Sequence, residues 1–283
     1  MLQHGSLLAP SLAAGSAPSR SHLEGVWTLT LSDDELARYA RHIVLKEFGG
    51  DGQLRMKGSH VAVIGAGGIG SPAIQYLAAA GVGRLTLIDD DRVEASNLQR
   101  QTIYATGDIG AAKVEAAAAR ARAINPHVEV RTLCERIDAR SAAALLDGAH
   151  AVLDGSDSFA TRFAVADAAL TLRIPLISAA VGQFEGQLGT YRGWEADKPC
   201  YRCFVGEAPE LAETSCAEDG ILGPVAGVLG SLAALEAIRA VAPFGDDTAG
   251  KLLLVDLLSL RFRTIRLPKD PGCPACSTLT GTP

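Results

Sequence analysis

The feature that most constrains the fold is the stretch HVAVIGAGGIGSPAIQYLAAAGVGRLTLIDDD, residues 60–91. An apolar strand enters a glycine-rich turn that opens a helix, and a second apolar strand ends in aspartates. The glycines of this turn allow close approach of the backbone to a phosphate, and N–H groups at the helix start face the anion. Asp89 follows about 20 residues later, where its carboxylate can accept hydrogen bonds from ribose hydroxyls. The stretch therefore predicts a βαβ unit that binds the adenosine part of a nucleotide, with contacts at Gly65, Gly67, Gly68 and Gly70.

The glycine turn alone does not choose between NAD, FAD and ATP, and the dinucleotides are its commoner ligands. The next segment, DDDRVEASNLQRQTIYATGDIGAAK, changes this balance because it places polar and cationic side chains after the ribose-binding strand. A triphosphate carries several negative charges that must be neutralised while its α-phosphorus is attacked, whereas a dehydrogenase has little use for such cations. The segment favours ATP, with solvated surface residues as the alternative reading for its cations, and its candidate ligands are Asp91, Asn97, Arg100 and Lys113.

Strands and helices alternate as far as about residue 180, which predicts a parallel, doubly wound sheet. Beyond it, residues 186–194 and 251–267 are predicted strands, the second of them long, and residues 224–242 are a predicted helix between them. We therefore expect an α/β fold with a Rossmann-like sheet, parallel in the N-terminal half and extended by antiparallel strands. The Ala/Ser/Gly/Pro-rich residues 1–26 are predicted to be a flexible extension, and residues 27–283 to be a single domain.

A helix is predicted to start at Ser32, because Glu35 three residues later completes a capping box. Gly49 and Gly50 are predicted to end it. Its expected apolar face consists of Leu36, Ala40, Ile43 and Val44.

Charge and hydropathy argue against two partners, nucleic acid and a membrane. The chain of 283 residues has 26 basic and 32 acidic residues and a net charge of −6, with no basic cluster that would neutralise a nucleic acid backbone. We also expect no membrane span, because no apolar run approaches the roughly 20 residues required. A cytoplasmic location is expected.

Four of the six cysteines form two CxxC motifs, Cys200-Tyr-Arg-Cys203 and Cys273-Pro-Ala-Cys276. Each motif brings two thiolates within reach of one ion, so together they predict a closed, structural Cys₄ zinc site. Disulfides or redox-active pairs are the competing interpretation. Cys134 is expected to fill the core of a strand over residues 128–137. Cys216 precedes a predicted helix whose dipole would lower its thiol pKa, so it is either reactive or passive.

Long motifs make the chain resemble the MoeB/ThiF family of adenylyltransferases, from about residue 31 to residue 276. They include LARYARHIVL, GAGGIG, LIDDDRVEASNLQRQ, GAAKVEA, LDGSDS, CYRC, TSCAEDGILGPVAGVLGSLAALEAI and PGCPAC. The resemblance implies that Gly68 lies against ATP and Asp89 on its ribose. It also implies that three side chains surround the phosphates, namely Asn97, Arg100 and Lys113.

The same resemblance implies that Asp157 acts on the Mg²⁺ side of the site. It further implies that Arg41 reaches the ATP site of a partner in a homodimer, and that Cys216 links covalently to the carrier protein, as in some relatives. Ser158 departs from the family, which often has Asn there, although a hydroxyl can still hydrogen-bond to the nucleotide.

The expected reaction is adenylation of the C-terminal carboxylate of a small ubiquitin-like sulfur-carrier protein ending in Gly-Gly. The expected cofactors are ATP, Mg²⁺ and structural Zn²⁺. A separate protein is expected to donate the sulfur, since the sequence shows no rhodanese-type domain. Adenylation of a peptide or a tRNA-linked carboxylate, a non-catalytic zinc scaffold, and a dinucleotide-dependent oxidoreductase are the alternatives.

Overall fold

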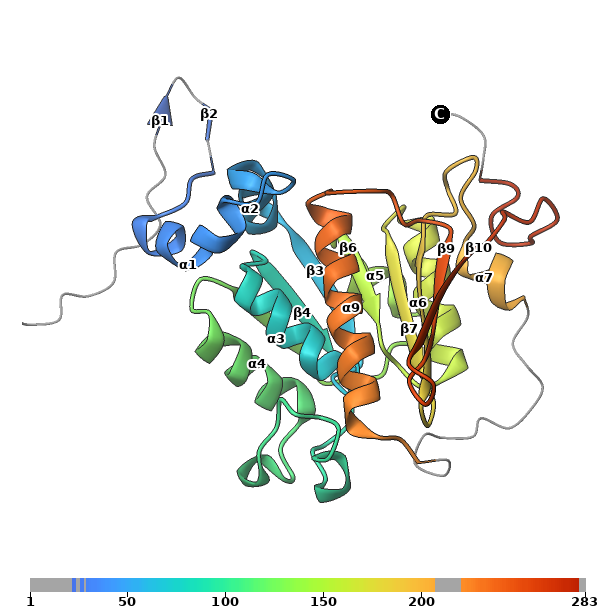
Figure 1. The fold of residues 1–283 in the computed structure, drawn as a ribbon, viewed down its shortest axis with the longest axis horizontal. Coiled ribbons are helices and arrows are strands. Elements are labelled where there is room, and N and C mark those ends of the chain that lie inside the picture. The colour runs from blue at the N-terminus through green and yellow to red at the C-terminus, as the bar shows by residue number, and fades with distance from the viewer. Residues whose placement is uncertain (1–21, 24–25, 28, 207–219, 280–283) are drawn as a thin grey trace, which may run out of the picture.

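A computed structural model describes residues 22–23, 26–27, 29–206 and 220–279 (Figure 1). Its first elements, β1 (His22–Leu23) and β2 (Val26–Trp27), pair as a short antiparallel ribbon. Most of the predicted extension, residues 1–26, lies outside the described residues.

Eight strands form one mixed sheet in the order β10-β9-β8-β7-β6-β3-β4-β5. Five of them are parallel: β3 (His60–Ile64), β4 (Arg84–Ile88), β5 (Glu129–Leu133), β6 (Ala151–Asp154) and β7 (Leu176–Val181). The remaining three continue the sheet in antiparallel fashion: β8 (Glu185–Tyr191), β9 (Lys251–Asp256) and β10 (Arg261–Arg266). The predicted fold class, parallel strands extended by antiparallel ones, is confirmed.

Helices cover both faces of this sheet (Figure 1). One face packs against α3 (Gly70–Ala80), α4 (Lys113–Ile124) and α9 (Gly223–Val241), whose alanine-rich sides allow close approach. The other face packs against α5 (Ala142–Leu146) and α6 (Phe159–Thr171). After β3 the chain first adds β4 and β5 on one side of β3, and it later adds β6 on the other side. The carboxyl ends of β3 and β6 therefore flank a crevice, and ligands bind in crevices of this kind.

The first predicted helix begins as expected and ends earlier. In α1 (Asp33–Ile43) the Ser32 hydroxyl accepts from the Glu35 amide at 3.3 Å, while the Glu35 carboxylate accepts from the Ser32 amide at 2.8 Å. Gly49 does not end this helix; it starts α2 (Gly49–Gly58). The predicted apolar face is also wrong, because α1 buries Glu35 and Tyr39 and leaves Leu36 and Val44 exposed.

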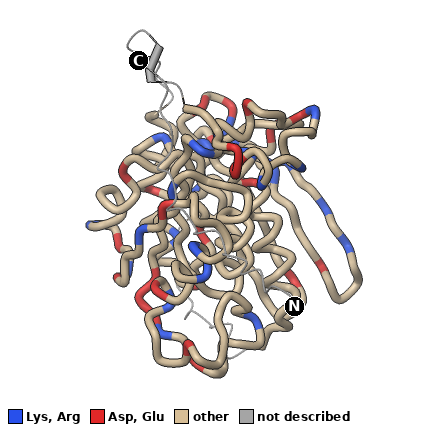
Figure 2. The backbone as a smooth tube through the Cα atoms, turned by 90° about the vertical axis from the view of Figure 1, so that its left-hand side faces the viewer, with Lys and Arg blue, Asp and Glu red and all other residues tan. Residues whose placement is uncertain are grey.

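The predicted long strand over residues 251–267 is in fact a hairpin. Strands β9 and β10 pair antiparallel, from Asp256 opposite Arg261 to Lys251 opposite Arg266. In the turn, the Asp256 carboxylate accepts from the Ser259 amide at 3.0 Å, and Leu260 adopts a left-handed φ of 52°. Over most of the described backbone basic and acidic residues are interspersed, whereas the hairpin of β9 and β10 carries mostly basic ones (Figure 2).

Among the residues the structure describes, one helix is long and apolar enough to cross a membrane, so the expectation that no segment reaches this length was wrong. It is α9, with 19 residues and a mean hydropathy of 1.5 over its most apolar window, of which 39% is buried. Core helices of globular proteins meet the same criteria, and α9 packs on α3 and on strands β6, β7 and β8. Length and composition alone are therefore weak evidence for a span.

His60, at the start of β3, predicts a pH dependence of stability. Its Nδ1 donates to the Gly148 carbonyl at 3.0 Å, so in the neutral ring Nε2 accepts from the Thr86 hydroxyl at 2.8 Å. Burial lowers the pKa of His60 below its ordinary 6.5, and it outweighs the hydrogen bond to Gly148, which raises that pKa. Below about pH 6.5 the unfolded chain therefore binds more protons than the folded chain, and stability falls as the pH drops through the folded pKa.

We expect the melting temperature to fall more steeply between pH 7 and pH 5 in the native chain than in His60→Gln, whose amide does not titrate. Thermal unfolding followed by circular dichroism at each pH makes the comparison. Equal slopes for the two proteins would contradict the prediction.

Candidate functional site

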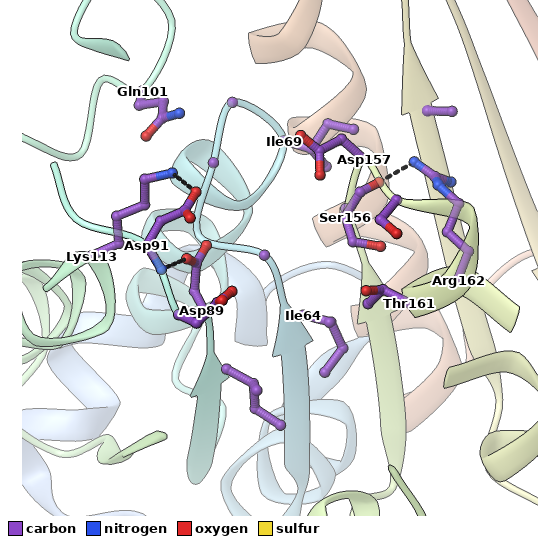
Figure 3. Close-up of a pocket in the computed structure, with 18 of the residues that line it drawn as sticks. Ile64, Ile69, Asp89, Asp91, Gln101, Lys113, Ser156, Asp157, Thr161 and Arg162 are labelled. Atoms are coloured by element: carbon purple, nitrogen blue, oxygen red, sulfur yellow. Dashed lines mark hydrogen bonds and ion pairs between the residues drawn. The ribbon is translucent and has the colours of Figure 1, made fainter. Parts of the chain in front are cut away.

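A cavity of about 610 Å³ lies at the carboxyl ends of the parallel strands (Figure 3). The glycine turn after β3, the aspartates after β4, the loop after β6 and the ends of β7 and β8 all contribute to its wall. It brings together most of the residues predicted from the sequence: Gly65, Gly67, Gly68, Asp89, Asp91, Asn97, Arg100, Lys113, Asp157 and Ser158. Gly70, the first residue of α3, does not line the cavity.

The glycine turn is held in a shape that side chains would obstruct. Gly65 has a left-handed φ of +84°, and a Cβ on Gly70 would lie only 2.1 Å from the Gly65 carbonyl oxygen. A Cβ on Gly68 would approach the Ala226 Cβ of α9 to 3.0 Å. The glycines therefore let the turn pack tightly between α3 and α9 while its backbone remains open to the cavity.

Asp89 is fixed at the end of β4. Its carboxylate accepts from the Ala66 amide at 2.7 Å and from the Asp91 amide at 2.8 Å. Burial raises the pKa of Asp89, and the charge of Lys113 and the two amide hydrogen bonds oppose that rise. The side chain thus faces the cavity as an oriented acceptor joined to the glycine turn (Figure 3), which is the arrangement that suits a ribose.

Two cations border the same part of the cavity. The Lys113 ammonium lies 2.7 Å from the Asp91 carboxylate, and the lysine side chain is only 6% exposed. Arg100 donates from Nη1 to the Ser96 carbonyl at 3.1 Å, and Asn97 ends the short 3₁₀ helix Ala95–Asn97. Positive charge beside open backbone amides can bind phosphate oxygens.

The loop after β6 holds Asp157. It starts at buried Asp154, whose Oδ1 accepts from the Ser156 amide at 3.0 Å and from its hydroxyl at 2.7 Å. Asp157 and Ser158 then line the cavity, and Ser158 is the N-cap residue of α6. A carboxylate at this position, with a hydroxyl next to it, offers the oxygen ligands that Mg²⁺ prefers.

Sequence reasoning missed Arg162 and Tyr201, which also line the cavity. Arg162 is 7% exposed and donates to the Ser156 and Ala179 carbonyls, the second at 3.0 Å. The available signal was an arginine in the mostly apolar helix sequence FATRFAVADAALT, one turn after Ser158.

The four cysteines of the CxxC motifs come together as predicted. Their sulfur atoms lie within 4.8 Å of one another, with separations of 3.7 Å for Cys200–Cys203, 3.6 Å for Cys200–Cys273 and 3.5 Å for Cys203–Cys276. These separations are too long for disulfides and close to the roughly 3.8 Å that a tetrahedral ion with 2.3 Å metal–sulfur bonds requires. The cluster therefore fits zinc, with all four positions filled by protein.

The other predicted residues lie elsewhere. Arg41 is exposed on α1 and does not line the cavity of its own chain. Cys134 is exposed after the end of β5, so its predicted place in the core was wrong. Cys216 lies outside the described residues.

A glycine turn, a ribose-side carboxylate and phosphate-side cations on a doubly wound sheet define a nucleotide-binding α/β protein with a separate four-cysteine centre. The chain belongs to the ThiF family, whose model matches residues 39–275. It is 43% identical over 250 residues to the SAMP-activating enzyme E1 of Haloferax volcanii, covering 88% of this chain and 92% of that protein. It is 41% identical over 246 residues to the molybdopterin-synthase adenylyltransferase of Salmonella typhimurium, covering 87% and 98%.

Other relatives are longer. The chain spans 56% of the adenylyltransferase and sulfurtransferase MOCS3 of Drosophila ananassae. Among solved structures, E. coli MccB with ATP is similar in fold, with a TM-score of 0.74 at 23% identity over 85% of this chain and 74% of that one. The resemblance to the MoeB/ThiF family is therefore confirmed.

Proposed function

We propose that this protein adenylates the C-terminal glycine carboxylate of a ubiquitin-like sulfur-carrier protein with ATP. The observation that carries the proposal is the single cavity that combines Asp89, the open glycine turn, Arg100 and Lys113. Relatives of nearly equal length named as a SAMP-activating enzyme and a molybdopterin-synthase adenylyltransferase support the choice of reaction and substrate.

In this proposal, Asp89 orients the ribose, and the glycine turn allows the phosphates to approach the start of α3. Arg100 and Lys113 stabilise the charge that develops on the phosphates as the carrier carboxylate attacks the α-phosphorus and pyrophosphate leaves. Asn97 and Ser158 add hydrogen bonds to the nucleotide. The product is an acyl-adenylate, and the step needs no side-chain nucleophile, because the protein contributes position and electrostatics.

Asp157 would hold Mg²⁺ together with the phosphate oxygens. The ion, when bound, neutralises charge on the transferring and leaving phosphates. The Cys₄ cluster would hold a structural Zn²⁺, and a reducing compartment such as the cytoplasm would keep its thiols free for the metal.

A homodimer is part of the proposal because Arg41 cannot serve a site that it does not line. Helix α1 and the residues after it expose apolar side chains, with Leu36 at 44%, Leu45 at 52% and Val44 at 75%. Such side chains suit a protein interface. In the proposed dimer a second copy covers these side chains and supplies its own Arg41 to this cavity. A separate donor protein supplies the thiocarboxylate sulfur.

The test is ATP–pyrophosphate exchange with labelled pyrophosphate and a purified carrier ending in Gly-Gly. Exchange should require the carrier and should fall about 100-fold in Asp157→Asn, which keeps the side-chain shape but removes its charge. The matched control is the same carrier without its terminal glycine. Measurable ATP binding without exchange for any carrier would refute the proposal and favour a peptide substrate or a scaffold.

A further inference from the structure

The first CxxC motif lies against helix α6, and its two central side chains contact that helix in different ways. Arg202, in α7 (Tyr201–Val205), forms a fork with Asp167, with Nε–Oδ1 at 2.8 Å and Nη2–Oδ2 at 2.7 Å. Its guanidinium also lies 4.5 Å from the centre of the Phe163 ring. The motif is therefore fastened to α6 on the side of the cysteine cluster.

Tyr201, the neighbouring residue, lines the nucleotide cavity and is only 4% exposed. Its ring packs edge-to-face on Phe163 and Tyr191, with centroids 5.8 Å and 5.5 Å away. Burial raises the pKa of its hydroxyl, and the nearby positive charge of Arg162 opposes that rise. Tyr201 therefore lies beside Arg162, because both residues line the cavity and the Tyr201 ring packs on Phe163, the residue that follows Arg162 in α6.

Arg162 joins the ends of two neighbouring strands. It donates to the Ser156 carbonyl in the loop after β6, and to the Ala179 carbonyl at 3.0 Å and the Ser178 hydroxyl at 3.4 Å in β7. Within the described residues, no carboxylate lies within ion-pair distance of this buried cation. The hydrogen bonds that compensate the desolvation of this guanidinium all go to neutral acceptors. The position of Arg162 therefore depends on the Ser156 and Ala179 carbonyls and the Ser178 hydroxyl together.

These contacts form a continuous path from the cysteine cluster to Asp157. Cys200 and Cys203 flank Tyr201 in the chain, the Tyr201 ring packs on Phe163 next to Arg162, and Arg162 donates to the carbonyl of Ser156, the residue before Asp157. We propose that Arg162 and Tyr201 are positioning residues through which an ordered Cys₄ cluster sets the conformation of the Asp157 loop. The inference deepens the proposed function and rests on it, because Asp157 is assigned to catalysis only there.

The first experiment compares Arg162→Gln, Arg162→Lys and Tyr201→Phe with Tyr191→Phe. Tyr191 is the matched control, since it is a buried tyrosine that packs on the Tyr201 ring and does not line the cavity. In pyrophosphate exchange, kcat should fall about 10- to 100-fold in Arg162→Gln and about 10-fold in Tyr201→Phe. The KM for the carrier should stay unchanged, and Arg162→Lys should recover part of the loss because it keeps the charge and some of the hydrogen bonds.

The second experiment measures the loop directly. Amide hydrogen exchange of residues 154–158 should accelerate in Arg162→Gln and, in the native chain, after a chelator removes the metal. Metal removal should add little in Tyr201→Phe, because the same path is already interrupted. Metal content and circular dichroism of each variant establish that it is folded.

Native kcat in both Arg162→Gln and Tyr201→Phe would overturn the inference, as would unchanged loop exchange after metal removal. Failure of the proposed function is a distinct result. In that case the native chain itself shows no pyrophosphate exchange, while hydrogen exchange of the loop still decides whether the cluster and the loop are coupled.

Discussion

Replacing Lys113 with alanine should lower kcat/KM for pyrophosphate exchange by about 100- to 1,000-fold. The ammonium is nearly buried at the edge of the cavity and has one paired carboxylate, Asp91, whose side chain is 59% exposed. A desolvated cation acts strongly on nearby phosphate charge because little water screens it. Stability should change little, since an ion pair with an exposed partner contributes at most about 1 kcal/mol.

Arg120→Ala is the matched control, because Arg120 is an exposed cation on the same helix, α4. It should leave exchange unchanged. The measurement is initial exchange rate against ATP concentration, together with the melting temperature of each variant. A Lys113→Ala protein with native kcat/KM would remove Lys113 from the catalytic set.

Replacing Cys273 with serine should remove the bound metal and cause the largest loss of stability among the changes considered. Three of the four cysteines are buried, with Cys200 at 4%, Cys273 at 1% and Cys276 at 0% exposed. Binding free energy at such a cluster adds to the free energy of folding. Each kcal/mol lost lowers the melting temperature of a large domain by about 2–4 °C, so a fall of at least about 10 °C is expected.

Cys134→Ser is the control for that experiment, because it removes one thiol from an exposed position outside the cluster. Elemental analysis should find about one zinc per chain in the native protein and in Cys134→Ser, and close to none in Cys273→Ser. Full metal content in Cys273→Ser would contradict the assignment of the cluster.

The nucleotide-binding half of the fold could be predicted because its signals are local and agree with one another. The glycine turn, the apolar strands and the acid after β4 lie within residues 60–91, and each has a single structural use there. The β9–β10 turn could not be predicted from the same rules. It contains no glycine or proline, and its reversal depends on the Asp256–Ser259 contact and on Leu260 in a left-handed conformation.

The wrong prediction for the buried face of α1 has a different cause, namely contacts with residues far away in the sequence. Helix α1 buries Glu35 because Lys57 pairs with it at 2.6 Å, and it buries Tyr39 because Asn125 donates to its hydroxyl at 2.8 Å. Neither partner is visible from the spacing of apolar residues. Arg162 was missed for a related reason, since its role depends on how α6 is rotated against β6 and β7.

The positions of the four cysteines in the sequence also determine when, during synthesis, the metal site can be completed. One pair of thiols, Cys200 and Cys203, precedes α9 and the last hairpin, and the other pair, Cys273 and Cys276, follows them. A ribosome that has made every strand of the sheet has therefore still made only half of the metal ligands. The metal can be fully enclosed only after Cys276 has emerged, so its capture completes the assembly of the fold and does not initiate it.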